Sequence, residues 1–159
     1  MNYDEQKLQQ QCVAWFRTQY PQYAMLLTHP INEGHRGTAK IGGMHKAEGT
    51  VAGVPDLLLF VPSQSGIMTF GCLGIEFKTP KGKQSQSQKD FEQYFISAGN
   101  VYVVVRSFEE FKRLVTNWLR NTPEFIHVSV TRAHKTVQEE SAQRERERFY
   151  KVIGKPCPK

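Results

Sequence analysis

The fold is decided by one stretch, residues 54–89, VPDLLLFVPSQSGIMTFGCLGIEFKTPKGKQSQSQK. Its first apolar run predicts a strand over residues 54–61, buried on both faces, with Pro55 near its start because proline cannot donate a ladder hydrogen bond. Residues 62–66 predict a turn and residues 67–78 a second strand, in which glycines indicate a bulge or a close backbone approach. Because the connection is short, the two strands should be antiparallel.

Three helices are predicted around this pair of strands. Residues 4–20 carry apolar side chains at helical spacing. A second helix should begin at Ser85 or Ser87, which are both plausible N-caps, and should end before Gly99. A third helix, over residues 107–121, opens with a capping-box pattern.

Two further strands complete the predicted sheet. Residues 24–28 are a short strand candidate, and residues 101–105 predict a buried strand. The buried strand should lie parallel to residues 67–78, because a helix makes the connection as a right-handed crossover. The order helix, three strands, helix, strand, helix predicts an α/β domain over residues 1–123. Composition changes after it, so residues 124–159 are assigned to a charged extension.

The composition favours a soluble protein with a basic surface. The chain has 159 residues and a formal net charge of +6, which favours a polyanionic partner such as nucleic acid without excluding an ordinary basic protein. The three cysteines lie far apart and form no CxxC pair, which fits a reducing cytosol. The N-terminus is polar, and no apolar run approaches the roughly 18 residues of a membrane span. We therefore expect a cytoplasmic protein with no membrane partner.

Two carboxylates and a lysine are predicted to meet at one end of the antiparallel pair. Asp56 lies near the start of one strand, and Glu76 and Lys78 lie near the end of its neighbour, so the two ends are adjacent. Glu76 and Lys78 share one face, because successive side chains of a strand alternate. Two carboxylates suit Mg²⁺, which usually keeps several waters and takes substrate phosphate oxygens. Asp56 and Glu76 are therefore candidate metal ligands, with the Phe77 carbonyl as a third.

The expected chemistry is hydrolysis of a phosphodiester. The metal would polarise the phosphate and lower the pKa of a bound water. Lys78 would orient that water and stabilise developing negative charge. The alternative is a surface Glu–Lys pair on a strand, which is a common feature without a function. The position of the pair, beside Asp56 and before a basic loop, favours the functional interpretation.

Basic side chains on two segments are candidate contacts for nucleic acid. Residues 29–53 are rich in glycine and basic residues, so they would either hold phosphates or form a mobile surface excursion. The second segment follows the predicted lysine of the site. The candidate DNA-binding residues are Arg36, Lys40, Lys46, Lys81, Lys83 and Lys89.

Three short motifs carry a resemblance to a known family. Gly53-Val-Pro-Asp56, then Gly74-Ile-Glu-Phe-Lys78, then Gln88 resemble the PD-(D/E)xK nuclease superfamily. Within it the chain is most similar to the virus-type replication–repair nuclease (VRR-NUC) domain, which includes small stand-alone phage and bacterial proteins. The resemblance implies a restriction-endonuclease-like αβββαβ core with a central mixed four-stranded sheet. It also implies dependence on Mg²⁺ or Mn²⁺ and hydrolysis of DNA, often at branched structures.

The resemblance also assigns roles by position. Asp56, Glu76 and Lys78 match the core motif, and Gln88 matches a helix glutamine that supports the active site. Glu5 matches a first-helix acid that helps the metal site directly or through water. Spacing alone leaves Glu5 either as a solvated acid in the first helical turn or as an inward-pointing group. Small stand-alone members resemble Holliday-junction resolvases and work as homodimers, so a homodimer acting on junction DNA is implied.

Two other functions remain compatible with the same residues. The chain could be a non-catalytic DNA-binding subunit that keeps the fold, although every position of the core motif is occupied. It could also be a nuclease of the same fold that acts on RNA or on a defined duplex site. The leading hypothesis is a metal-dependent, structure-selective DNA endonuclease.

Overall fold

A mixed four-stranded sheet forms the centre of the protein. The computed structural model describes residues 3–30, 49–65 and 68–121. The strand order is β1 (Leu27–Thr28), β2 (Leu57–Leu59), β5 (Leu73–Phe77) and β6 (Val101–Val105). β2 is antiparallel to β1 and β5, whereas β6 is parallel to β5. The predicted α/β fold class, the antiparallel central pair and the parallel last strand are confirmed.

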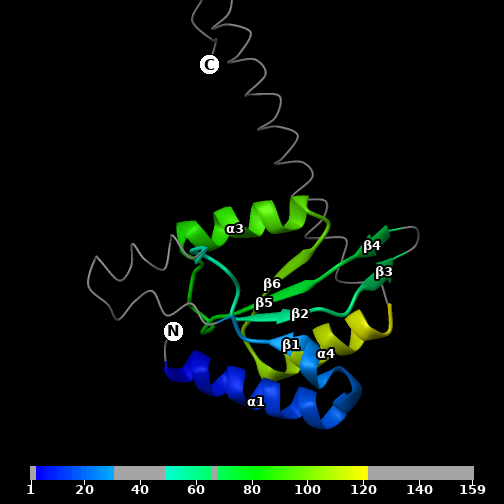
Figure 1. Ribbon diagram of the computed structural model, residues 1–159. Coiled ribbons are helices and arrows are strands. Elements are labelled where there is room, and N and C mark those ends of the chain that lie inside the picture. The colour runs from blue at the N-terminus through cyan, green and yellow to red at the C-terminus, as the bar shows by residue number, and fades with distance from the viewer. Residues whose placement is uncertain (1–2, 31–48, 66–67, 122–159) are drawn as a thin grey trace, which may run out of the picture.

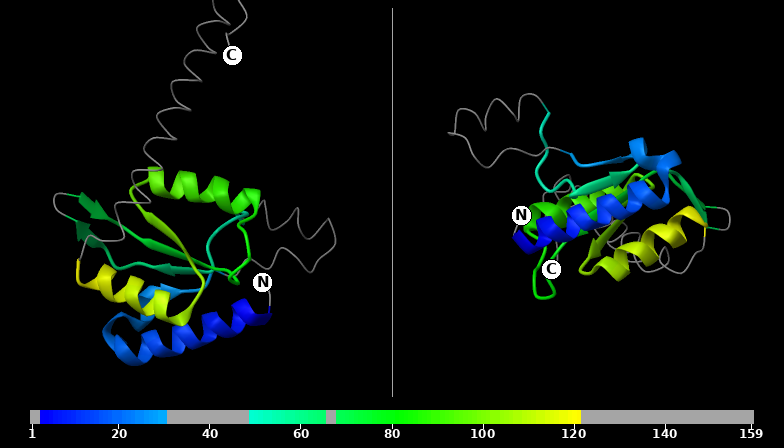
Figure 2. Two further views of the ribbon diagram at one scale, coloured as in Figure 1. Left: turned by 180° about the vertical axis from the view of Figure 1, so that it is seen from behind. Right: turned by 90° about the horizontal axis from the view of Figure 1, so that it is seen from below.

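Helices cover both faces of the sheet. α1 (Tyr3–Gln19) and α4 (Phe108–Leu119) pack on one face, and α3 (Gln86–Ser97) lies on the other, as Figures 1 and 2 show. The main core lies between the sheet and the α1–α4 pair, and it includes Phe16, Ile75, Phe77 and Phe111. Because side chains alternate along β5, the residue between Ile75 and Phe77 faces α3 instead.

The ends of α3 form as the sequence predicts. Ser85 is the N-cap, and its side chain accepts a hydrogen bond from the Gln88 amide, while the Gln88 side chain accepts one from the Ser85 amide. Gly99 ends the helix with a φ of 81°, a left-handed conformation that glycine adopts without a steric penalty.

The cap of α4 differs from the predicted capping box. The Ser107 side chain accepts the Glu110 amide, as expected. The Glu110 carboxylate, however, accepts from the Arg106 amide at 2.7 Å, one residue before the cap. The helix is therefore tied back to the end of β6.

The segment between β2 and β5 was predicted incorrectly. Residues 62–66 are not a simple turn, and residues 67–78 are not one strand. β3 (Ser63–Ser65) and β4 (Met68–Phe70) form a separate two-stranded sheet, and β5 begins only after Gly71 and Cys72. The Ser63 hydroxyl donates to the Trp118 carbonyl at 2.7 Å, so contacts with the end of α4 hold this hairpin away from the central sheet.

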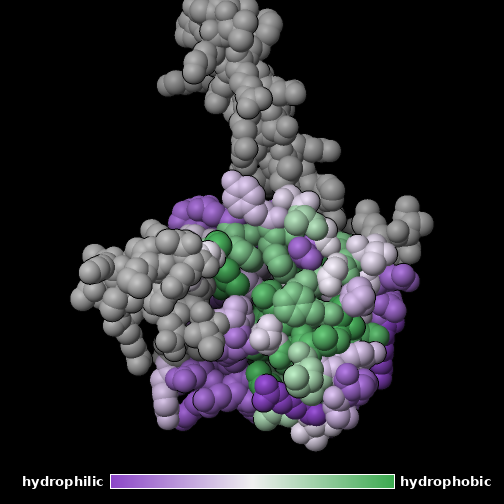
Figure 3. All heavy atoms as spheres, in the orientation of Figure 1, coloured by the Kyte–Doolittle hydropathy of each residue, from purple (hydrophilic) through white to green (hydrophobic). Residues whose placement is uncertain are grey.

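The two strands nearest the open edge are shorter than predicted. Of residues 24–28, only Leu27 and Thr28 are in β1, because a 3₁₀ helix, η1 (Pro21–Leu26), precedes them. Of residues 54–61, only Leu57–Leu59 form β2, and Phe60 is 50% exposed rather than buried. Apolar surface gathers in front of these strands (Figure 3), where Met25, Leu26 and Phe60 are exposed.

Several predictions lie outside the described residues. The glycine-rich basic segment 29–53 is described only at its two ends, and the extension 124–159 is not described. Among the helices of the described ranges, none combines the length and apolar character that a membrane span requires.

Two glycines allow close packing between α3 and the sheet. A Cβ on Gly74 would lie 3.0 Å from both Phe95 and Pro55, which confirms the close approach predicted in this strand. Gly53 packs even more tightly, because a Cβ there would lie 2.0 Å from the Ser87 carbonyl oxygen. Gly53 also has a φ of 89°. The loop that leads into β2 therefore rests on the first turn of α3.

We expect Gly53→Ala to destabilise the protein more than Gly99→Ala. Both glycines have positive φ, which penalises an alanine by about 1–2 kcal/mol. Only Gly53 has backbone atoms in the way, and overpacking adds about 1–3 kcal/mol. Urea unfolding of the two variants measures the difference, and equal losses would show that the contact with α3 is unimportant for stability.

Candidate active site

The side chain of Asp56 is held against the end of β5, while its main-chain carbonyl bonds to His29 and Gln9. Its Oδ2 accepts the Phe77 amide at 2.8 Å. Its carbonyl oxygen lies 2.6 Å from His29 Nδ1 and accepts from Gln9 Nε2 at 3.5 Å. The start of β2 and the end of β5 are thus joined through this carboxylate, as the hairpin arrangement predicted.

Glu76 is the most deeply buried charged group of the site, with 1% of its surface exposed. Its Oε1 accepts from Lys78 Nζ at 2.5 Å and from Gln88 Nε2. Its Oε2 accepts from the Tyr102 hydroxyl at 3.3 Å. Groups from β5, α3 and β6 therefore converge on one carboxylate, and they include the predicted lysine and glutamine.

Burial works against the negative charge of both carboxylates. Burial raises the pKa of Asp56, although the Phe77 amide and Lys78 oppose this. Burial also raises the pKa of Glu76, and the charge of Asp56 raises it further, whereas Lys78 lowers it. Since the two carboxylates repel each other, a cation placed between them would stabilise both.

Glu5 points inward from the first turn of α1. It is 8% exposed, and its Oε1 accepts the Thr79 amide at 3.0 Å. Its charge also raises the pKa of Asp56, so the two groups lie near each other. Of the two orientations that the spacing left open, the structure has the inward one.

The donor set fits a hard divalent cation. Within the described ranges, no three side chains of His, Cys, Asp or Glu converge as a metal-binding group. The site instead offers the carboxylates of Asp56 and Glu76, with Glu5 nearby. Mg²⁺ is usually bound by one or two carboxylates and completes its shell with water and phosphate oxygens. The residues present fit that mode of binding rather than a closed structural site.

The predicted DNA-binding residues fall into two groups. Lys81 and Lys83 are exposed in the loop that follows β5, and Lys89 is exposed on α3. The structure therefore brings these three basic residues to the surface on segments that adjoin the site. The remaining candidates, Arg36, Lys40 and Lys46, lie outside the described residues.

The family comparison agrees with this geometry. The model of the VRR-NUC domain matches residues 1–109. The chain belongs to the VRR-NUC family. This is a nuclease-type family, and the match includes each of Glu5, Asp56, Glu76, Lys78 and Gln88.

A solved structure supports the fold assignment. A "VRR_NUC domain protein" superimposes with a TM-score of 0.61 and 17% identity, over 76% of this chain and 91% of that one. At this identity the likeness shows the VRR-NUC fold alone. No curated protein matches the chain.

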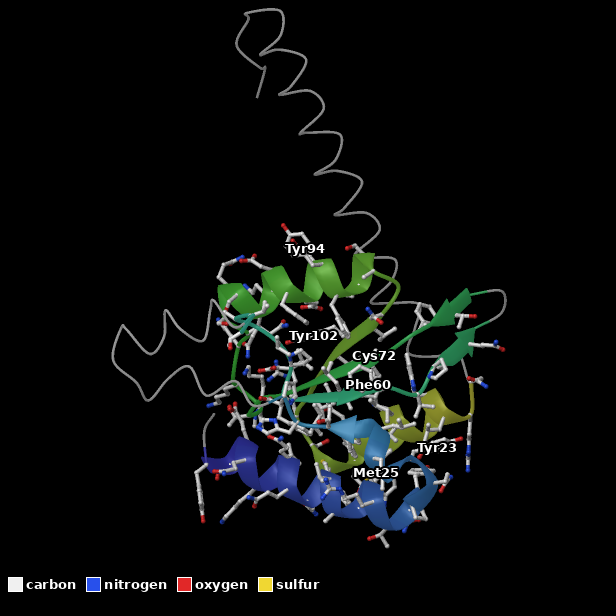
Figure 4. All side chains as sticks on the ribbon, viewed as in Figure 1. Tyr23, Met25, Phe60, Cys72, Tyr94 and Tyr102 are labelled. Carbon is white, nitrogen blue, oxygen red and sulfur yellow. The ribbon has the colours of Figure 1, made fainter. Side chains whose placement is uncertain are left out.

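Sequence reasoning missed the contribution of Tyr102 to this VRR-NUC site. Tyr102 lies on β6 between the sheet and α3 (Figure 4), where it is 1% exposed. It is the one hydroxyl-bearing residue in the run Val101–Val105, and it occupies a position that faces α3 with Glu76. A polar tip in a buried strand usually has a partner, so the residue type itself was a usable signal.

We expect Tyr102→Phe to lower the free energy of unfolding by about 1–3 kcal/mol, because it leaves a buried carboxylate with one donor fewer. The ring, and so its packing in the α3 cluster, is kept. Tyr94→Phe on α3 is the matched control, because Tyr94 is 68% exposed, and its effect should stay within about 0.5 kcal/mol. Indistinguishable urea midpoints would mean that the Tyr102 hydroxyl does not stabilise Glu76.

Proposed function

We propose that this protein is a Mg²⁺-dependent, structure-selective DNA endonuclease, with Mn²⁺ able to substitute, whose substrates are branched DNAs such as four-way junctions. The observation that carries the proposal is the convergence of Lys78, Gln88 and Tyr102 on the buried Glu76 carboxylate, beside Asp56. The charge of the half-buried Asp56 carboxylate opposes ionisation of the buried Glu76 carboxylate, which is unfavourable without a compensating cation. Their arrangement becomes favourable when a cation and a phosphate bind.

The reaction is hydrolysis of a phosphodiester. A water oxygen loses a proton and bonds to phosphorus, the bond from phosphorus to one sugar oxygen breaks, and that oxygen takes up a proton. Asp56 and Glu76 would hold Mg²⁺, which would supply Lewis-acid polarisation of the phosphate and a water of lowered pKa. Glu5 contributes its negative charge at the rim of the same site.

The chain's own residues orient the reacting groups. Lys78 extends beside Glu76 and donates hydrogen bonds to the attacking water and to the developing negative charge on phosphate oxygens. Gln88 donates to Glu76 from the α3 side, and this second hydrogen bond restricts rotation of the carboxylate. The positions of the reactive groups are therefore set before the substrate binds, which is the main contribution a protein makes to such a reaction.

The charge supports a nucleic-acid substrate, and the family resemblance is the reason to propose branched DNA. The net charge of +6, with Lys81, Lys83 and Lys89 near the site and Arg36, Lys40 and Lys46 in the basic segment, suits contacts with the phosphate backbone. The resemblance to junction-resolving members suggests a homodimer, whose two-fold axis would place two sites on paired strands of a junction.

Lys78→Ala and Asp56→Ala should each lower cleavage of branched DNA by at least about 100-fold, because each removes charge stabilisation from the transition state. The assay compares four-way junction, flap and linear duplex DNA of matched sequence, with Mg²⁺ or EDTA. Lys112→Ala on α4 is the matched control, since it removes one lysine that pairs with Glu109, outside the site.

The same assay distinguishes the alternatives. Full activity of either variant would contradict the mechanism, and binding without cutting by the wild type would favour a non-catalytic DNA-binding subunit. Preferred cutting of structured RNA or of linear duplex DNA would mean that this protein is a nuclease of the same fold with another substrate. Paired cuts across a junction would support the dimer, whereas single unpaired nicks would contradict it.

Mg²⁺ should raise the melting temperature of the wild type without any DNA. At 100 times its dissociation constant, a ligand that binds only the folded state stabilises it by about 2.7 kcal/mol. Asp56→Ala and Glu76→Gln should lose this shift, each measured against its own melt in EDTA, and Glu5→Ala should reduce it. Glu109→Gln should keep the full shift, because that carboxylate lies on α4 and is 77% exposed. Equal shifts in all variants would mean that the cation binds elsewhere.

A further inference from the structure

One arginine joins the two ends of the turn that follows β5. Arg106 lies between β6 and α4, and its side chain is half-buried. Its Nη1 donates to the Thr79 carbonyl at 2.6 Å and to the Gly82 carbonyl at 2.9 Å. The turn is closed by its own hydrogen bond from the Gly82 amide to the Thr79 carbonyl at 3.0 Å. A single guanidinium thus holds both ends of the turn.

This turn controls where the strand with the site residues ends. Three consecutive amides, two before the turn and one at its first residue, make three different attachments: Phe77 to the Asp56 side chain, Lys78 to the Val105 carbonyl at 3.0 Å, and Thr79 to Glu5. A shift of the turn would therefore move the Thr79 amide off Glu5 and disturb Lys78, which is one residue away. After the turn the chain leads directly into the N-cap of α3 and Gln88.

Arg106 is itself fixed by rigid elements. Its amide donates to the Glu110 carboxylate in α4, and its chain position follows directly on β6. The turn is therefore anchored to the sheet and to α4 rather than to another loop. The same turn carries Lys81, and Lys83 follows it, but both side chains are exposed and neither is bound by Arg106.

We propose that Arg106 is a positioning residue for the nuclease site: it clamps the Thr79–Gly82 turn and so fixes Lys78 and Gln88, which both donate to Glu76 Oε1. The catalytic part of this inference rests on the proposed function. Arg106 acts through the turn and does not contact the substrate phosphate. Nothing in the core motif of the family assigns this residue a role, because it lies one strand away from the motif.

Arginine suits this task better than lysine. Its guanidinium is planar, stays charged, and presents its N–H groups in a fixed fork, whereas the lysine ammonium is a point charge on a flexible stem that is one bond shorter. Hydrogen bonds from a charged donor are also the stronger ones. Lysine at this position should therefore restore the charge but only part of the geometry.

The test compares Arg106→Ala, Arg106→Lys and a matched control, Arg17→Ala. Arg17 is exposed in the last turn of α1, twelve residues after Glu5 and so about 18 Å away along the helix. For Arg106→Ala we expect kcat on branched DNA to fall by about 10–100-fold, as small misplacements of reacting groups do. KM should change by less than about twofold, Arg106→Lys should recover part of kcat, and Arg17→Ala should behave as wild type.

Salt dependence separates positioning from direct phosphate binding. A lost phosphate contact lowers the slope of log Kobs against log salt by about 0.9 for duplex DNA. Lys81→Ala should show a smaller slope of this kind, and Arg106→Ala should not. The positioning role would be overturned if Arg106→Ala reduced the salt slope and Arg106→Lys fully restored both the slope and kcat. Arg106 would then be a phosphate contact.

Amide hydrogen exchange tests the clamp independently of any cleavage. In Arg106→Ala the Thr79 and Gly82 amides should exchange at least about tenfold faster, because the turn opens more easily, while amides in the middle of α1 keep their wild-type rates. Unchanged exchange at both amides would overturn the inference whether or not the protein cuts DNA. Faster exchange in a protein whose wild type cuts nothing would keep the clamp and reject the proposed function.

Discussion

The burial of the Glu76 carboxylate is the constraint on which the rest of the site depends. A charge that is 1% exposed is stable only if donors surround it, and these donors come from three separate elements. Lys78 directly follows β5, Gln88 lies on the crossover helix α3, and Tyr102 lies on the parallel neighbour β6. The crossover that places α3 over β5 and β6 is thus also what makes a buried carboxylate possible.

Successive side chains of β5 point to opposite faces of the sheet, so some of its residues pack the core and others form the site. Phe77 sends its ring into the main core while its amide binds Asp56, so one residue serves both packing and the site. Glu76 and Lys78 point to the α3 side, where the polar side chain of Gln88 donates to Glu76. The Lys78 amide still donates to the Val105 carbonyl of β6. Beyond Lys78 the chain leaves the sheet, and the Thr79 amide can bind Glu5 from α1. The end of one strand therefore collects carboxylates from three parts of the chain.

Local patterns were sufficient for the features that depend on local geometry. The period of two in residues 73–78 placed Glu76 and Lys78 together, and the N-cap candidates Ser85 and Ser87 marked the start of α3, because strand alternation and helix capping are properties of neighbouring residues. The β3–β4 hairpin could not be found this way. It depends on Ser63 and Gln64 bonding to Trp118 and Asn121, more than fifty residues later, and such pairs leave no periodic signal. The roles of Tyr102 and Arg106 were missed for the same reason.

The three separated parts of the motif form one mechanical unit. Gly53 has no side chain, so the loop before Asp56 can rest on the Ser87 carbonyl in the first turn of α3. The next residue of that turn is Gln88, which reaches Glu76 on β5, and Gly74 lets Phe95 of the same helix approach the sheet. Both glycines are therefore required by packing rather than by chemistry. They bring α3 close enough to the sheet for the Gln88 side chain to reach the buried Glu76 carboxylate. Without this close approach, Glu76, Lys78 and Gln88 would share a sequence pattern but would not form a site.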